Sequence, residues 1–86
     1  MVQNVYAVYD RNDSKLYQFA ALETVLAKDA VLAFMEENAS ALFGSGAAQV
    51  EAKEMAMRQV SDSDSIETLT SVLEDWELDF NLIQIV

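Results

Sequence analysis

Acidic side chains are the residues of this chain best suited to chemistry, and they concentrate in its last third. Residues 59–86 hold seven Asp and Glu and no Lys or Arg, whereas residues 1–58 hold eight acids and all five bases. The acids of the last third are Asp62, Asp64, Glu67, Glu74, Asp75, Glu77 and Asp79. Clustered carboxylates can bind a hard cation, exchange protons with a substrate, or present a negative surface to a basic partner.

A metal site is the first of these alternatives. The sequence DSDS at 62–65, followed by Glu67, has the carboxylate density of a calcium loop. It lacks the glycine and the distant bidentate glutamate of an EF-hand. We therefore interpret it as a solvated loop that caps the next helix, and we predict no metal and no cofactor.

Catalysis is the second alternative. The chain has no His and no Cys, which removes imidazole bases and thiolate nucleophiles. Its two glycines lie in GSG at 44–46, so neither a phosphate-binding glycine loop nor a nucleophile elbow is present. Paired carboxylates could act alone, but they need a concave pocket that an 86-residue domain rarely has. We predict a protein that is not an enzyme.

A partner-binding surface is the third alternative. The formal net charge of −10 repels phosphate backbones and anionic lipid surfaces, so direct binding to nucleic acid or to membranes is not expected. Carboxylates held on rigid elements can instead imitate a phosphate backbone and occupy the basic groove of another protein. The simpler interpretation is that these charges keep a chain with 52% hydrophobic residues in solution. Both interpretations are compatible with the charge pattern.

The N-terminal third predicts a β-hairpin. VYAVY at 5–9 and LYQF at 16–19 have strand composition, and DRNDSK at 10–15 is a turn cluster in which Asn12 and Asp13 favour reversal. The tyrosines of the hairpin predict a cross-strand cluster that packs in the core, with an interface role as the alternative. They are Tyr6, Tyr9 and Tyr17.

Helices follow the hairpin. Leu26 to Asn38 has an apolar stripe of helical period, with Thr24 as the expected N-cap and Gly44 or Gly46 as the exit. Residues 47–60 are ambiguous between helix and strand, and their composition favours helix. Asp64 and Glu67 form a candidate capping box for a third helix over about 65–76.

The chain closes with an expected strand at 78–86. Leu78, Phe80 and Leu82 alternate with polar residues, and Ile83, Ile85 and Val86 follow. The pattern predicts a strand that is half exposed at its start and buried near its end. At the edge of a sheet, such a strand would have unpaired backbone N–H and C=O groups that can pair with another chain.

These elements predict a single α+β domain over residues 1–86. The N-terminal hairpin and the C-terminal strand form a small antiparallel sheet, with two or three helices packed on one face. The absence of a membrane-spanning run and of a signal peptide predicts a cytoplasmic location.

Three segments also resemble a known family. They are NVYAVYDRNDSKLYQFAA, AKDAVLAFMEENAS and DFNLIQI, with matching positions Tyr6, Tyr9, Asp10, Phe19, Ala30, Phe34, Leu82 and Ile85. They resemble the small nonstructural proteins of gokushoviruses, a group of tiny bacteriophages, over less than half the chain; residues 39–77 have no counterpart. The resemblance implies a phage origin and hence the host cytoplasm. We do not expect the DNA binding ascribed to that family, because this chain has no basic patch.

Two functional hypotheses follow. In the first, the chain is an acidic interaction protein whose seven carboxylates at 62–79 bind and block a host protein with a basic surface; a nucleic-acid mimic is one form of this hypothesis. In the second, it is a structural homo-oligomer in which the strand at 78–86 pairs with a second copy.

Overall fold

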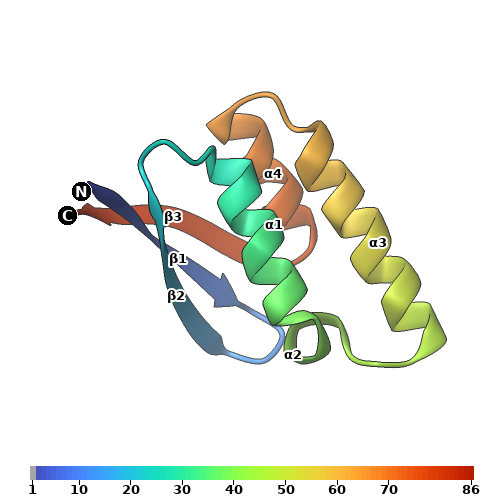
Figure 1. Ribbon diagram of the computed structural model, residues 1–86. Coiled ribbons are helices and arrows are strands. Elements are labelled where there is room, and N and C mark those ends of the chain that lie inside the picture. Colours follow the sequence, from blue (N-terminus) through green and yellow to red (C-terminus); the bar gives the residue numbers. More distant parts are fainter. Residues whose placement is uncertain (1) are drawn as a thin grey trace.

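A three-stranded antiparallel sheet and four helices make up the computed structural model, which describes residues 2–86. The elements are β1 (Gln3–Asp10), β2 (Lys15–Leu22), α1 (Ala27–Glu37), α2 (Ala39–Phe43), α3 (Ala47–Asp62), α4 (Ile66–Asp75) and β3 (Leu78–Ile85). The predicted α+β class, the hairpin and the C-terminal strand are confirmed (Figure 1).

The sheet has the order β2-β1-β3, so the first strand is central and the last strand is an edge. Tyr6 lies opposite Phe19 on one side and Leu82 on the other. Between β1 and β3 the register shifts, because Val5 pairs with Gln84 while Tyr6 pairs with Leu82. Ile83 is therefore the extra residue of a β-bulge in the edge strand.

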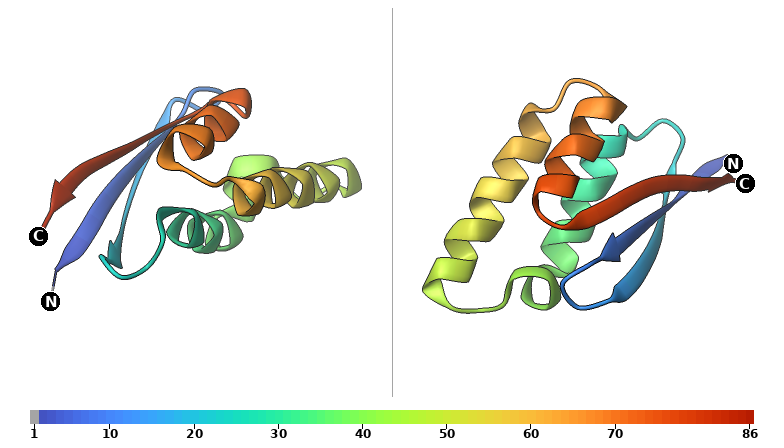
Figure 2. Two further views of the ribbon diagram at one scale, coloured as in Figure 1. Left: turned by 90° about the horizontal axis from the view of Figure 1, so that it is seen from above. Right: turned by 180° about the vertical axis from the view of Figure 1, so that it is seen from behind.

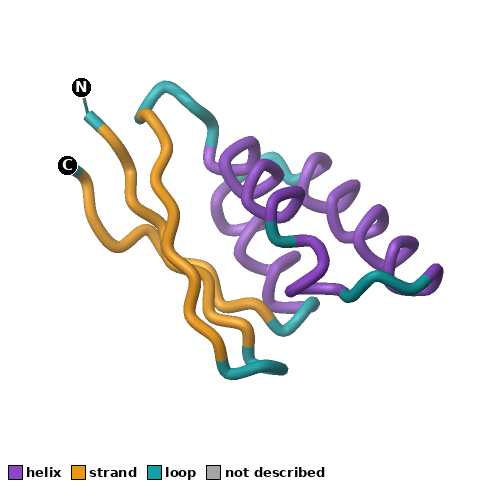
Figure 3. The backbone as a smooth tube through the Cα atoms, turned by 60° about the horizontal axis from the view of Figure 1, so that its bottom comes forward, coloured by secondary structure: helices purple, strands orange, loops and turns teal. Residues whose placement is uncertain are grey.

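All four helices lie on one side of the sheet, and its other face is bare (Figure 2). α1 packs near β2 and α4 packs against β3, while α3 packs against α1 and α4 farther from the sheet. Figure 3 shows the same layers, with the ends of the strands near the two chain termini extending beyond the helices.

The core lies between the sheet and the helices and has an aromatic centre. The rings of Phe19 and Phe34 stack at 4.6 Å between centroids, and Tyr6 packs on Phe19 at 5.5 Å and on Phe80 at 5.3 Å. Fully buried aliphatic side chains surround these rings, among them Val8, Val31, Met35, Val60, Leu69 and Leu73. The predicted tyrosine cluster divides, because Tyr6 and Tyr17 pack inward while Tyr9 is exposed.

The hairpin turn is organised by the first residue of the predicted turn cluster. Asp10 is 2% exposed, and its Oδ1 accepts the backbone N–H of Asn12 at 3.0 Å and that of Asp13 at 3.4 Å. The left-handed residue of the turn is Ser14, with φ 53°. The prediction of a reversal here is confirmed, and Asn12 and Asp13 take part through local hydrogen bonds of their backbone N–H groups.

The ambiguous segment 47–60 is helical, and it forms most of α3. Its buried residues, Ala56 and Val60, are four apart and therefore lie on the same side of the helix. α2 was not predicted, because its five residues are too few to show a helical period. Gly44 ends it with φ 88°, a conformation that favours glycine.

Some local predictions were wrong. α1 ends at Glu37 with Asn38 as its C-cap, so neither Gly44 nor Gly46 is its exit. α1 begins after Leu26, which makes no side-chain capping bond, so Thr24 is not its N-cap. In β3, Leu78 and Phe80 are buried whereas residues 81–86 are exposed, which reverses the predicted burial. The start of β3 packs under α4, while its end runs past the helices along the edge of the sheet.

Candidate protein-binding surface

α4 is the element that positions the largest group of predicted site residues. Its N-cap is Ser65, whose Oγ accepts the backbone N–H of Thr68 at 3.1 Å. The predicted cap, Asp64, lies one residue earlier and accepts the hydroxyl of Thr68 at 3.2 Å. The predicted capping box of Asp64 and Glu67 is thus replaced by Ser65 and Thr68, and Glu67 stays free on the first turn.

The two faces of α4 differ sharply in exposure. Leu69 and Leu73 are each 1% exposed and anchor the helix in the core. Glu67, Glu74 and Asp75 are exposed and form no ion pair within residues 2–86. We call these three carboxylates the α4 acidic face. Because the helix is fixed by its buried side, this face is a rigid negative surface.

Glu77 and Asp79 are in a different electrostatic setting. The guanidinium of Arg11 lies 3.4 Å from a carboxylate oxygen of Glu77 and 3.5 Å from one of Asp79. Its Nη2 also donates to the backbone oxygen of Glu74 at 3.0 Å. All three side chains are about half exposed, so each ion pair adds little stability, but the arginine offsets negative charge at this end of the predicted surface.

Asp62 and Asp64 occupy the junction between α3 and α4. Both are exposed, whereas Ser63 between them is 2% exposed and donates its hydroxyl to the oxygen of Val60 at 2.6 Å. Lys28 of α1 donates to the backbone oxygens of Ser61 and Ser63, each at 3.2 Å. This junction is a hydrogen-bonded helix end. No group of three or more acidic side chains within residues 2–86 is placed to hold a metal ion.

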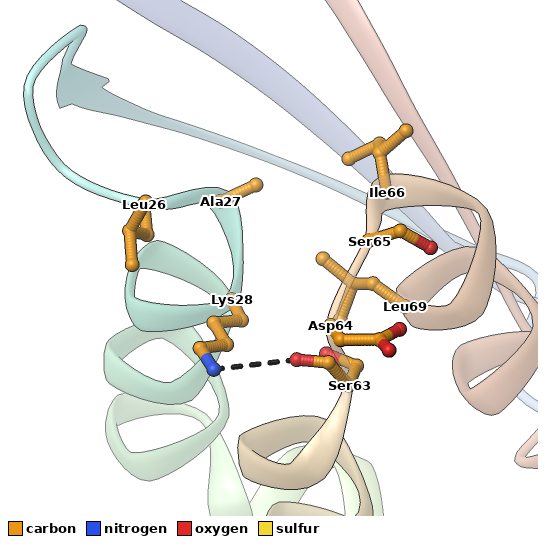
Figure 4. A pocket seen from close by; sticks show the side chains of 8 residues that line it. All are labelled: Leu26, Ala27, Lys28, Ser63, Asp64, Ser65, Ile66 and Leu69. Carbon is orange, nitrogen blue, oxygen red and sulfur yellow. Dashed lines mark hydrogen bonds between the residues drawn. The ribbon is translucent and has the colours of Figure 1, made fainter.

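A shallow cavity of about 220 Å³ lies beside this junction (Figure 4). Its lining comes from the start of α1 and from the α3–α4 connection: Leu26, Ala27, Lys28, Ser63, Asp64, Ser65, Ile66 and Leu69. Lys28 is already engaged by the two carbonyl groups, and Leu26 and Ile66 leave much of their apolar surface in solvent. The cavity is smaller than most small-molecule sites.

The structure therefore divides the seven predicted residues into three groups. Glu67, Glu74 and Asp75 share one exposed helix face, Glu77 and Asp79 flank Arg11, and Asp62 and Asp64 lie at the helix junction. The role of Arg11 leaves no signal in the sequence, since Arg11 precedes Glu74 by 63 residues and reaches it only through the pairing of β1 with β3.

Comparison of the chain with protein-family models, curated proteins and solved structures finds no match. No helix within residues 2–86 has both the length and the apolar character needed to cross a bilayer.

Proposed function

We propose that this chain is a small acidic protein-binding domain, without catalytic activity, that blocks a basic surface of another protein. The observation that carries the proposal is the α4 acidic face, with three exposed carboxylates on a helix anchored by Leu69 and Leu73. Charges held on a rigid scaffold attract an oppositely charged partner without first having to be ordered. Asp62 and Asp64 extend the negative field at one end, and Glu77 and Asp79 extend it less at the other, because Arg11 offsets part of their charge.

The proposal includes a phage origin and action in the host cytoplasm, supported by the resemblance described above. A basic groove that normally binds nucleic acid is the kind of surface that a row of carboxylates fits.

The test compares two variants of equal charge as baits in candidate host lysate at low and high salt. The first removes the α4 acidic face by Glu67→Gln, Glu74→Gln and Asp75→Asn. The matched control makes the same change of three charges elsewhere, by Glu23→Gln, Glu51→Gln and Glu54→Gln, all at exposed positions.

We expect the α4 variant to lose capture of the partner and the control variant to retain it. With the purified partner, the association rate constant should fall about tenfold for the α4 variant, because steering charges act mainly on association. High salt should weaken binding of the unmodified chain. Equal binding by both variants would contradict the proposal.

A second candidate function is a homo-oligomer formed through β3. The observation that favours it is the exposed end of this edge strand, where Leu82, Ile83 and Ile85 are 48%, 49% and 64% exposed. The bulge at Ile83 disfavours this homo-oligomer, because a bulge interrupts the regular hydrogen-bond ladder that pairing with a second copy needs.

A further inference from the structure

The edge formed by β2 is a more regular pairing surface than β3. Its register with β1 runs from Gln3–Leu22 to Asp10–Lys15 without a shift. Between Lys15 and Glu23 it carries no charged residue, since the intervening sequence is LYQFAAL. Apart from Lys15 at its first residue, this edge therefore lacks the bulge and the charges that usually protect an edge strand.

The free hydrogen-bonding groups of β2 follow from the alternation of the antiparallel ladder. Glu23 donates its N–H to the oxygen of Val2 at 3.1 Å, which places the odd-numbered residues of β2 toward β1. Leu16, Gln18 and Ala20 therefore direct their N–H and C=O groups away from the sheet. Within residues 2–86 these groups have no strand to pair with.

A hollow of about 190 Å³ lies between this edge and α1. Its lining residues come from β2, the following turn and one side of α1: Phe19, Ala20, Ala21, Val25, Asp29, Ala30, Ala33, Phe34 and Glu37. Ala20, Ala21, Ala30 and Ala33 are small and leave room, while Phe19 and Phe34 provide an aromatic floor. The free-edge residue Ala20 is itself part of the wall, so the hollow adjoins the open hydrogen-bonding edge.

The rim of the hollow is negative. Asp29 and Glu37 are eight residues apart on α1, about 12 Å along the helix, with Ala33 midway between them. Both are exposed, and neither forms an ion pair within residues 2–86. A Lys or Arg side chain that enters between them can lay its methylene groups on the alanine wall and bring its charge to either carboxylate.

We infer that an extended, basic segment of a partner protein adds to β2 as a fourth strand and places one Lys or Arg side chain in the hollow beside α1. Backbone hydrogen bonds to Gln18 and Ala20 provide affinity, and the apolar hollow with its two carboxylates selects the side chain. The inference rests on the proposed function, because it describes how the basic partner is held after the negative field has attracted it.

The probe is an acetylated and amidated heptapeptide of alternating threonine and valine with one central arginine, titrated into the ¹⁵N-labelled chain. We expect saturable shifts of the amide signals of Gln18 and Ala20, and slower hydrogen exchange at both. A peptide with a central glutamate should not bind. Absence of saturable shifts with the arginine peptide, or shifts confined to Leu82 and Ile85 of β3, would overturn the inference.

Variants test the two parts of the site. Ala20→Pro removes a free-edge N–H but no bond to β1, and proline is tolerated on edge strands, so peptide binding should weaken more than tenfold in a folded protein. Ala33→Leu fills the hollow from the exposed side of α1 and should have a similar effect without touching the strand. Asp29→Asn with Glu37→Gln should weaken binding about three- to tenfold.

Controls separate this inference from the proposed function. The matched pair Glu51→Gln and Glu54→Gln should bind the peptide like the unmodified chain, and so should the α4 variant. If the full partner needs the α4 acidic face but binds the Ala20→Pro and Ala33→Leu variants normally, the strand-addition inference is wrong and the proposed function stands. If the partner needs β2 and not α4, the proposed docking face is wrong.

Discussion

At the scale of single residues, two neighbouring side chains at the hairpin turn have different roles: Asp10 holds the turn, and Arg11 joins it to the last third of the chain. Asp10 is buried and satisfied by backbone N–H groups, and the neighbouring Arg11 reaches Glu74, Glu77 and Asp79. The turn therefore does more than reverse the chain, because it places a cation beside the acidic residues that follow α4. Charge counts along the sequence overstate the negative field at this point.

We expect Asp10→Ala to destabilise the fold by about 1–2 kcal/mol, since it leaves turn N–H groups without their acceptor. Urea unfolding followed by circular dichroism measures this change in the free energy of unfolding. The control is Asp13→Ala, at an exposed side chain that makes no hydrogen bond within residues 2–86, and it should change stability by less than about 0.5 kcal/mol. Equal losses in both variants would contradict the assigned role of Asp10.

At the scale of elements, α4 couples stability to the proposed function. One side supplies Leu69 and Leu73 to the core, and the other carries the α4 acidic face. The cap at Ser65 sets where the helix begins and therefore how Glu67 is presented.

Removing this cap by Ser65→Ala should lower the free energy of unfolding by about 1 kcal/mol. Ser71→Ala, at an exposed position inside the same helix, should leave stability unchanged or raise it, because alanine has the higher helix propensity. Chemical denaturation of the two variants side by side is the measurement. A Ser65→Ala variant as stable as the unmodified chain would show that the cap contributes nothing.

The elements also show what sequence patterns can and cannot predict. The hairpin and α1 were predictable, because strand composition around a turn cluster and a sustained apolar stripe are local signals. The burial of β3 was predicted backwards, since alternation shows which residues share a face but not which end of a strand lies under a helix. The ion pairs of Arg11 and the hollow beside β2 depend on contacts between distant segments, which no local pattern contains.

At the scale of the whole molecule, two features have opposite effects on self-association: the net charge disfavours it, and the exposed apolar end of β3 favours it. A charge of −10 on each copy disfavours self-association, and the bulge at Ile83 interrupts the edge. Leu82 and Ile85 nevertheless leave an apolar strip uncovered.

We expect light scattering at micromolar concentration and physiological salt to give the mass of a single copy, 9.6 kDa. A mass near twice this value would support the homo-oligomer instead. In that case Leu82→Lys, which adds a charge to the exposed edge, should restore the single copy, while Leu16→Lys on the opposite edge should not.

The pairing of Gln3 with Val86 has a practical consequence for how this fold can be joined to others. The two residues exchange backbone hydrogen bonds of 2.6 and 2.8 Å, at the end of the sheet opposite Arg11. An engineered carrier protein could therefore hold this domain as an insertion in one of its surface loops, because the two junctions lie at adjacent points. In such a fusion the helices would not contact the carrier protein, and the carboxylates of α4 would remain accessible to solvent.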